Sequence, residues 1–294
     1  MDRIEASELI LNKDGSIFHL HLQPEQLARN VILVGDPGRV ELIAGFFEKI
    51  ESRAANREFV SITGQYRGVR ITALSTGIGT DNIDIVVNEL DALVNIDLVS
   101  RKIKEKHTSL NLVRIGTSGS LQPDIPVGAF IASGKSIGFD GLLNFYSGRN
   151  QVSDLEFEKS FMSYTNWNDK LAAPYVVDAS ELLLEKIAGD NILQGVNISA
   201  PGFYGPQGRI LRLALADPSL NEKIEKFRFN QLKITNYEME SSAIYGLSKL
   251  LGHHALTICL IIANRVTKDT HENYYPLMKE MVEMILDKLV ALKE

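Results

Sequence analysis

Two arginines of this chain stand within or directly after short segments rich in glycine. The segments are Gly35-Asp36-Pro37-Gly38-Arg39 and Arg114-Ile115-Gly116-Thr117-Ser118-Gly119. Arginine binds phosphate through paired hydrogen bonds, and glycine lets backbone N–H groups approach an oxyanion closely. Arg114 interrupts an apolar run, where an unpaired charge is costly, so it must meet an anion or a carboxylate. The pattern predicts an anion pocket, although a solvated Arg39 and a structural ion pair at Arg114 explain the local sequences equally well.

A third glycine-rich segment, Gly77-Ile78-Gly79, invites a dinucleotide interpretation. Asn82 occupies the position of the third glycine of that pattern, and the chain has no lysine motif of the phosphate-loop type. The glycines suit N–H donation to an oxyanion, but taken alone they are typical of a structural turn.

Residues that could bind a nucleobase and a sugar occur in the second half of the chain. Phe203, Gln207 and Arg209 combine a ring, an amide and a donor-only guanidinium, which matches the carbonyls and N–H of a pyrimidine dione. A loop arginine solvated outside the fold is the alternative. Glu238 and Glu240 are predicted to open a helix, on which carboxylates two residues apart diverge. A favourable helix-dipole interaction is the simpler interpretation, and binding of vicinal sugar hydroxyls is the functional one.

The histidines and the cysteine form no recognisable catalytic pattern. His19 and His21 would share one face of a strand, but no third ligand has suitable spacing, so we predict no metal site. The spacing supports neither a Ser/His/Asp nor a Cys/His arrangement. Cys259 is the single cysteine, and its apolar surroundings are typical of a small core residue rather than a reactive thiol.

Short β-branched runs alternate with longer segments of helical spacing. We expect strands at 31–34, 69–74, 112–115, 129–137, 192–199 and 255–262, and helices at 40–47, 82–106, 239–251 and 273–292. This order is typical of an α/β fold with a central mixed, mostly parallel sheet flanked by helices. No linker or repeat divides the chain, so residues 1–294 are predicted to form one domain. Because ligands bind at the carboxyl ends of parallel strands, the glycine-rich segments should converge there.

The stretch 139–174 is the least periodic part of the chain and contains Trp167, the only tryptophan. A long loop-rich stretch is commonly functional or mobile, so we expect a loop here, for example a lid.

The composition restricts the partners. Lysine and arginine total 31 and the acidic residues 37, which gives a formal net charge of −6 and a pI of about 5.6. Neither a nucleic-acid polymer nor an anionic membrane surface suits this charge. No apolar run approaches the ~18 residues of a membrane span, and the polar N-terminal residues are unlike a signal peptide. We expect a soluble, cytoplasmic protein.

Five segments occur in the order of a known family. They are 35–39, Asn56-Arg57-Glu58-Phe59, Ser75-Thr76-Gly77-Ile78-Gly79, 114–119 and Asn236-Tyr237-Glu238-Met239-Glu240-Ser241. Together they resemble the nucleoside phosphorylase superfamily and, within it, the uridine phosphorylases. Gln207 and Arg209 resemble the uracil-binding element of that group. Asn264 stands where bacterial-type purine enzymes of the family place an aspartate that acts as an acid toward the purine N7.

The resemblance implies roles for individual residues. The phosphate would contact Gly35, Arg39, Arg114 and Thr117, together with Arg57 from a neighbouring subunit. The ribose would contact Met239, Glu240 and the neighbouring subunit's His19. The base would contact Phe203, Gln207 and Arg209, supported by Arg265. Arg114, Gln207 and Arg209 would be catalytic. Some relatives hold potassium at the dimer interface, and Glu58 and Ile78 match two of its contacts, whereas Asn82 replaces the expected serine.

The implied reaction is the reversible phosphorolysis of uridine, or of deoxyuridine, to uracil and (deoxy)ribose 1-phosphate. Inorganic phosphate is the co-substrate, and no cofactor is implied. The implied assembly is a homo-oligomer, either a dimer or a hexamer of dimers, with active sites shared between subunits. The role would be nucleoside catabolism and pyrimidine salvage.

Three other functions use the same fold. They are a purine nucleoside phosphorylase, a nucleosidase and a non-catalytic nucleoside-binding protein. A nucleosidase uses water and needs no arginine clamp, and a binding protein would have a broken phosphate or base site. The sequence does not rank uridine against deoxyuridine or thymidine.

Overall fold

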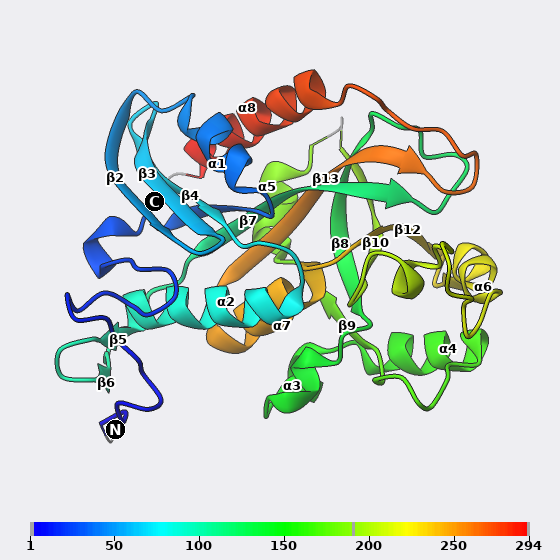
Figure 1. Cartoon of the computed structure of the whole chain (residues 1–294), viewed down its shortest axis with the longest axis horizontal. Coiled ribbons are helices and arrows are strands. Elements are labelled where there is room, and N and C mark those ends of the chain that lie inside the picture. The colour runs from blue at the N-terminus through cyan, green and yellow to red at the C-terminus, as the bar shows by residue number, and fades with distance from the viewer. Residues whose placement is uncertain (1–2, 190–191, 293–294) are drawn as a thin grey trace.

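One mixed sheet runs through the molecule, which is known from a computed structural model that describes residues 3–189 and 192–292. The strand order is β11-β12-β10-β8-β13-β7-β1-β4-β3-β2, with β9 paired to β8 (Figure 1). The strands are β1 (Asn30–Val34), β2 (Lys49–Asn56), β3 (Phe59–Tyr66), β4 (Val69–Ser75), β7 (Asn111–Ser120), β8 (Phe130–Gly138), β9 (Tyr175–Asp178), β10 (Leu193–Ser199), β11 (Arg228–Phe229), β12 (Leu232–Glu238) and β13 (His254–Asn264). All six runs predicted to be strands lie in this sheet, and the mixed α/β fold is confirmed.

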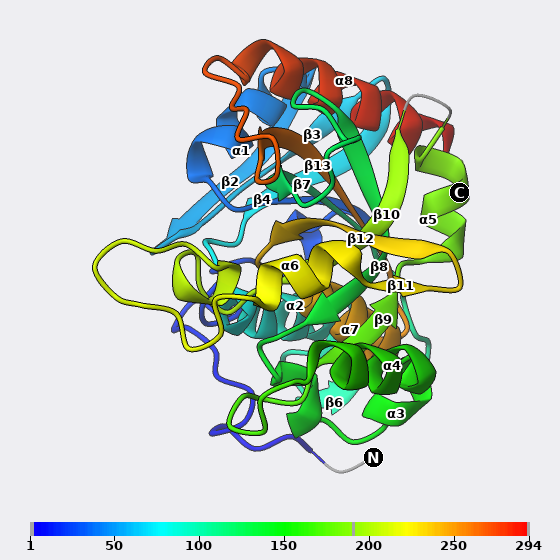
Figure 2. The same cartoon turned by 90° about the vertical axis from the view of Figure 1, so that its right-hand side faces the viewer.

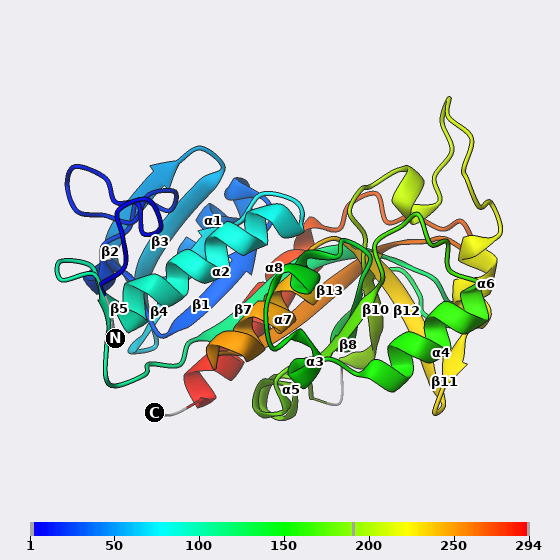
Figure 3. The same cartoon turned by 90° about the horizontal axis from the view of Figure 1, so that it is seen from below.

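Helices cover both faces of the sheet (Figures 1 and 3). On one face α2 (Thr80–Asn95) packs beside α7 (Ser241–Leu251), and on the other lie α1 (Pro37–Ala44), α5 (Glu181–Ile187) and α8 (Tyr275–Ala291). The apolar side of α8 shows why such segments form helices here: Met278, Met281, Val282, Ile285, Leu286 and Leu289 are buried at helical spacing.

The parallel strands β1, β7 and β13 end at one edge of the sheet, which is where a ligand site is expected. β7 is long enough to pair with β13 along most of its length and with β12 at its end, through Gly119 opposite Tyr237 and Ser120 opposite Asn236. Strands β7, β12, β10, β8 and β13 therefore form a closed ring. This closure brings Tyr237 and the residues after it next to the end of β7.

The helix predicted at 82–106 is wrong in its second half. Helix α2 ends at Asn95, and a short hairpin of β5 (Ile96–Asp97) and β6 (Lys102–Ile103) follows. The amide of Asn95 exchanges hydrogen bonds with the backbone of Thr108, and the Asp97 carboxylate accepts from the N–H groups of Val99 and Ser100. These side-chain bonds to the backbone replace the helical ones and end the helix.

The loop or lid predicted at 139–174 is also wrong. This stretch contains η2 (Leu142–Phe145), α3 (Arg149–Val152) and α4 (Leu155–Thr165). Phe157 and Phe161, one turn apart on α4, are buried in a hydrophobic cluster, and the Trp167 ring lies 4.6 Å from that of Phe139 between centroids. The structure describes all of residues 139–174, and none of them lines the cavity at the ends of β1, β7 and β13 that is described below. Phe157 and Phe161, four residues apart, were the sequence signal for a packed helix in this stretch.

The hairpin of β2 and β3, which no predicted strand covers, extends the sheet beyond β4. The turn of this hairpin carries Arg57 in a left-handed conformation, with φ of 55°. Among residues 3–189 and 192–292, none of the helices combines the length and apolar character that a bilayer crossing requires.

Candidate active site

An open cavity of about 730 Å³ lies at the sheet edge where β1, β7 and β13 end. Most residues predicted to bind phosphate, ribose or base line it, although they come from distant parts of the sequence. The lining consists of Gly35, Asp36, Pro37, Arg39, Ile78, Arg114, Thr117, Ser118, Gly119, Phe203, Gln207, Arg209, Tyr237, Glu238, Met239, Glu240, Ile262, Ala263, Thr270 and His271.

One end of the cavity is formed by the turn after β1 and the start of α1. The Asp36 side chain accepts a hydrogen bond from the Gly38 N–H at 2.8 Å, and Pro37 occupies the first turn, so the helix start is capped as its sequence suggests. Arg39 extends across β7, where its Nη1 lies 3.4 Å from the carbonyl oxygen of Ile115. Burial and then the nearby Arg114 charge lower the pKa of Arg39 from its ordinary value. An anion bound here would relieve the repulsion between the two arginines.

Arg114 is buried on β7 and contacts two carboxylates. Its guanidinium lies 3.3 Å from Glu238 and forms a closer ion pair with Glu240. Burial works against the guanidinium charge, but Glu240 and Glu238 outweigh it and raise the pKa of Arg114. Gly116 makes room for this arrangement, because a Cβ there would collide with the Arg114 guanidinium. The structural ion pair that the sequence left open is therefore present, and it lies inside the cavity.

The expectation that Glu238 and Glu240 diverge on a helix is wrong. Glu238 is the last residue of β12, and α7 begins only at Ser241, so both residues precede the helix, and both carboxylates contact Arg114. The Glu238 carboxylate accepts from the N–H groups of Glu240 and Ser241, at 2.8 and 3.0 Å, and so stabilises the start of α7. The helix-terminus role belongs to Glu238, and Glu240 is left facing the cavity.

Glu240 is also held by the glycine segment after β4. The N–H of Gly79 donates to its carboxylate at 2.8 Å, and Gly79 has a φ of 102° that favours glycine. The predicted N–H donation to an oxyanion is thus observed, with a carboxylate of the protein as the acceptor. Burial raises the pKa of Glu240, an effect that Arg114 opposes.

The opposite end of the cavity contains the residues predicted to bind a base. Gln207, which is buried, belongs to the short helix η3 (Gly205–Gln207), and its Oε1 accepts a hydrogen bond from Arg209 Nη1 at 2.5 Å. The same Nη1 donates to the Phe203 carbonyl oxygen at 2.6 Å, and the guanidinium lies 3.7 Å from the centroid of the Phe203 ring. Burial and the charge of Arg265 lower the pKa of Arg209 to about 10, so Arg209 is charged at neutral pH. The ring, amide and guanidinium form one cluster.

Arg265 lies outside the cavity lining and contacts Tyr237, which is part of that lining. Its guanidinium lies 5.8 Å from the centroid of the Tyr237 ring, and its Nη1 is buried without a hydrogen-bond partner among the described residues. Burial lowers the pKa of Arg265. Arg265 is not among the residues that line the cavity, so its predicted role is limited to support.

Asn264 is turned away from the cavity. Its amide donates to the carbonyl oxygens of Gln122 and Ile125, each at 2.9 Å, and its Oδ1 accepts from the N–H groups of Val266 and Thr267. These bonds tie the loop after β13 to the segment between β7 and β8. The side chain at this position is therefore occupied with backbone contacts and is not free to contact a base.

His19 and Arg57, which the resemblance assigned to a neighbouring subunit, do not line the cavity. They lie close to each other beside the β2–β3 turn, where the amide of Asn56 donates to the His19 carbonyl oxygen at 2.8 Å. His19 Nδ1 hydrogen-bonds to Glu89 of α2 at 2.6 Å, whereas His21 lies near Asp14. The two histidines contact different carboxylates and do not form a pair for a metal.

Glu58 lies between this turn and the cavity. A Cβ on Gly77 would lie 3.1 Å from Cγ of Glu58 and would collide with the amide nitrogen of Asn82, so the three residues are neighbours. Ile78 lines the cavity and is 67% exposed. Glu58 and Asn82 thus both lie against Gly77, the residue before Ile78; binding of potassium stays a prediction.

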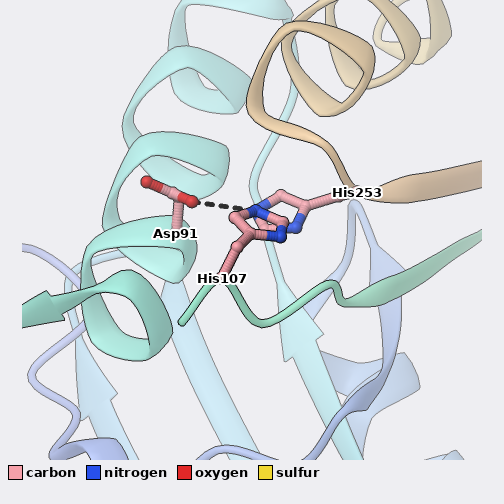
Figure 4. A group of neighbouring side chains, drawn as sticks. All are labelled: Asp91, His107 and His253. Atoms are coloured by element: carbon pink, nitrogen blue, oxygen red, sulfur yellow. Dashed lines mark ion pairs between the residues drawn. The ribbon is translucent and has the colours of Figure 1, made fainter. Parts of the chain in front are cut away.

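A different group of possible metal ligands lies at the far end of α2, where Asp91 approaches His107 and His253 (Figure 4). The Leu110 N–H donates to His253 Nδ1 at 3.2 Å, which leaves the ring proton on Nε2. That atom lies 3.2 Å from an Asp91 oxygen but makes no hydrogen bond among the described residues. The His107 ring lies within 25° of parallel to that of His253 and donates its Nε2 proton to Leu251. A metal needs converging lone pairs, and these hydrogen bonds favour a structural clamp instead.

Thr270 and His271 also line the cavity, although no sequence motif singles them out. After Asn264 the chain reverses direction and runs back beside the end of β13. Thr270 then forms an antiparallel bridge with Ala263, and the His271 N–H donates to the Ile262 carbonyl oxygen. No motif marks this return, because it depends on the loop contacts of Asn264.

Cys259 is buried beside the site, as expected of a core residue. Burial raises the pKa of its thiol to about 12, so the thiol is protonated and unreactive at neutral pH. Arg114 Nη1 lies 3.6 Å from its sulfur.

Known proteins share this chain's sequence and fold. A uridine phosphorylase of Thermococcus kodakarensis is 28% identical over 277 residues, covering 92% of this chain and 85% of the relative. A uridine phosphorylase of Haemophilus influenzae is 29% identical over 257 residues, covering 87% and 89%. A DeoD-type purine nucleoside phosphorylase of Listeria monocytogenes is 27% identical over 244 residues, covering 83% and 85%.

Among solved structures, a nucleoside phosphorylase of Trypanosoma brucei described as showing uridine phosphorylase activity superposes with a TM-score of 0.89. It is 29% identical, and the match covers 96% of this chain and 99% of that one. The family model described as Phosphorylase superfamily matches residues 29–291, which include every cavity residue named above. By sequence and fold alike, the chain belongs to the phosphorylase superfamily.

Proposed function

We propose that this enzyme is a uridine phosphorylase, a pentosyltransferase that converts uridine and phosphate reversibly to uracil and ribose 1-phosphate. The observation that carries the proposal is that the Phe203–Gln207–Arg209 cluster lines the same cavity as Arg39, Arg114 and Thr117. Glu240 and Met239 lie with them, where a ribose would join base and phosphate.

The phosphate end has too little positive charge within one chain. Glu238 and Glu240 both pair with Arg114, so a doubly charged phosphate beside Arg39 needs backbone donors and another cation. We assign the added cation to Arg57 of a second copy, because Arg57 lies outside the cavity on the β2–β3 turn. Gly35 and Thr117 supply an N–H and a hydroxyl at this end.

The base end suits uracil. With Gln207 Oε1 held by Arg209, the amide N–H₂ of Gln207 is free to donate to one uracil carbonyl, and the Arg209 guanidinium is available to another. Uracil gains negative charge on these oxygens as the glycosidic bond breaks, so donors that are already positioned lower the barrier. Phe203 offers a ring face for stacking.

The chemical step needs no enzyme nucleophile. The bond between C1′ and N1 of uracil breaks, its electron pair stays on the base, and a phosphate oxygen forms the new bond to C1′. The sugar is oxocarbenium-like between these events. The enzyme holds phosphate near C1′ and fixes the ribose through its hydroxyls on Glu240, with the 5′-hydroxyl on His19 of a second copy. No cofactor takes part.

This proposal requires a homo-oligomer, a dimer or a hexamer of dimers, with shared active sites. The exposure of Ile78 beside the cavity supports it, as does the loop between η3 and α6 (Leu220–Lys226), which extends away from the sheet (Figure 2). On that loop Ile210, Leu211 and Leu213 are 60%, 76% and 83% exposed, and such apolar surface is typical of an interface. We place the enzyme in cytoplasmic pyrimidine salvage.

Purine nucleoside phosphorylase is the second candidate, given the Listeria relatives. The position of Asn264 argues against it. A purine enzyme of this type needs an acid toward N7, whereas Asn264 is an amide whose side-chain hydrogen bonds all go to backbone groups of its own loop and of the segment between β7 and β8.

Release of free base by purified protein tests the proposal. Uridine, deoxyuridine, thymidine and inosine are each supplied with and without phosphate. We expect uracil from uridine only when phosphate is present. Release without phosphate would identify a nucleosidase, preference for inosine a purine enzyme, and binding without release a non-catalytic protein.

A further inference from the structure

The carboxylate of Glu89 concentrates four hydrogen bonds on one short segment of the chain. Its Oε1 lies 2.6 Å from His19 Nδ1, and its two oxygens accept from the N–H of His19 at 3.0 and 3.1 Å and from that of Leu20 at 2.8 Å. Glu89 lies on α2, 70 residues from His19 in sequence, and its side chain is only 13% exposed. A partly buried carboxylate with this many donors is held in one place.

The remaining contacts fix the histidine from its other sides. Asn56 donates to the His19 carbonyl oxygen, and Leu20, the next residue, is buried in the core. The Phe18 and Phe59 rings lie 4.8 and 6.5 Å from the imidazole between centroids, both at steep angles. Within the described residues of the single chain, Nε2 of His19 forms no hydrogen bond, although 27% of the side chain is exposed.

We propose that Glu89 is a positioning residue for the nucleoside: it keeps a proton on Nδ1 of His19 and aims the free Nε2 at the ribose 5′-hydroxyl in the active site of a second copy. This inference rests on the proposed function, in which His19 contacts that hydroxyl. A carboxylate only accepts hydrogen bonds, so Nδ1 must carry the proton. In the neutral ring Nε2 is then an acceptor, which suits a hydroxyl donor.

The same helix connects this pair with the chain's own cavity. Helix α2 starts at Thr80, directly after Gly79, whose N–H holds Glu240. Glu89 lies farther along the same helix, so a single rigid element positions a ribose ligand for each of two active sites. This geometry explains why a side chain outside the cavity matters for the reaction.

A substrate without the 5′-hydroxyl separates positioning from simple stabilisation. In Glu89→Gln, an amide replaces the carboxylate with little change in size, and its N–H₂ opposes the Nδ1 proton. We expect kcat/KM for uridine to fall about tenfold, in keeping with loss of one good hydrogen bond. For 5′-deoxyuridine, kcat/KM should stay within about twofold of wild type, because no hydroxyl is there to be bound.

Three further variants make the outcome decisive. His19→Ala should reproduce the selective loss, and Glu89→Gln with His19→Ala should lose no more selectivity than His19→Ala alone. Asp91→Asn, the same chemical change on the same helix without contact to His19, should leave both substrates unaffected. Thermal melting of each variant monitors folding.

The possible failures are distinguishable. If His19→Ala is selective against uridine and Glu89→Gln is not, the positioning role is overturned while the proposed ribose contact stands. If Glu89→Gln reduces both substrates equally, Glu89 only anchors the N-terminal segment and the inference is wrong. If His19→Ala loses no selectivity, the ribose contact in the proposed function fails, and this inference fails with it.

Discussion

The cavity and the β2–β3 edge treat their charged residues differently. In the cavity Arg114 pairs with Glu238 and Glu240, and Arg209 bonds to Gln207 and Phe203. At the edge Arg53 of β2 forms an exposed ion pair with Glu41, and Arg57 in the turn has no hydrogen bond or ion pair to the described residues. The cavity is assembled before any ligand arrives, whereas the edge presents groups outward.

This difference indicates which arginines are paired within the chain and which are left to bind a ligand. A fully buried guanidinium without a counter-charge is costly, so Arg114 needs its two carboxylates within the chain. An exposed arginine is solvated and can wait for a ligand at little cost. The β2–β3 edge therefore presents Arg57 to a second copy of the chain. The variants below test whether the cavity and this edge have these separate roles.

The largest effect is expected from Arg114→Met. This change leaves two buried carboxylates without their cation, which should lower the free energy of unfolding by about 3–5 kcal/mol. It should also reduce kcat/KM for uridine at least a hundredfold, by loss of a charged phosphate contact. Denaturant unfolding and steady-state kinetics measure the two effects.

Arg114→Met combined with Glu240→Gln is the control. It removes one of the stranded charges and should recover part of the stability without recovering activity. If Arg114→Met alone is as stable and as active as wild type, Arg114 is needed neither to balance the two carboxylates nor to bind phosphate.

Arg209→Ala removes a donor that we expect to stabilise the developing uracil anion. Loss of one such donor typically costs ~3 kcal/mol, so kcat/KM for uridine should fall on the order of a hundredfold. Arg212→Ala, an arginine three positions along the same loop and outside the cavity lining, should have a wild-type rate. A wild-type rate for Arg209→Ala itself would remove the base-site assignment.

Arg57→Ala tests whether the edge acts on another copy. Alone, it should lower kcat/KM about tenfold to a hundredfold, as expected for a charged hydrogen bond to phosphate. Its thermal stability should be unchanged, because Arg57 has no partner in the chain to lose.

Co-expression of Arg57→Ala with Arg209→Ala sharpens this test. In a mixed dimer with shared sites, one of the two sites has both arginines, so activity should recover to about a quarter of wild type. If the mixture is no more active than the average of the two variants, Arg57 acts within its own chain or not at all.

The smallest effect on uridine turnover is expected from Asn264→Asp. The new carboxylate would face the carbonyl oxygens of Gln122 and Ile125, so we expect a loss of about 2 kcal/mol in unfolding free energy. No inosine phosphorolysis should appear, because the side chain points into its own loop. Inosine turnover by this variant would show that the loop can turn toward the base.

Local chemistry was a good guide where a feature depends on neighbouring residues. The apolar runs predicted six strands of the sheet. It failed where long-range contacts decide. The apolar spacing predicted a helix over 82–106, but the helix ends at Asn95. The contact that ends it is with Thr108, 13 residues farther along the chain, and local spacing does not show such a contact.

By itself the sequence determined the α/β alternation and the chemical groups available for an anion, a sugar and a base, because side-chain type and backbone propensity are local. Only the tertiary structure decided how these groups are used. Arg114 and Glu240 are 126 residues apart, yet they meet because β12 closes on the end of β7. His19 and Glu89 meet because the N-terminal segment folds onto α2. These pairings set which charges are balanced within the chain and which groups face outward, and no local pattern encodes them.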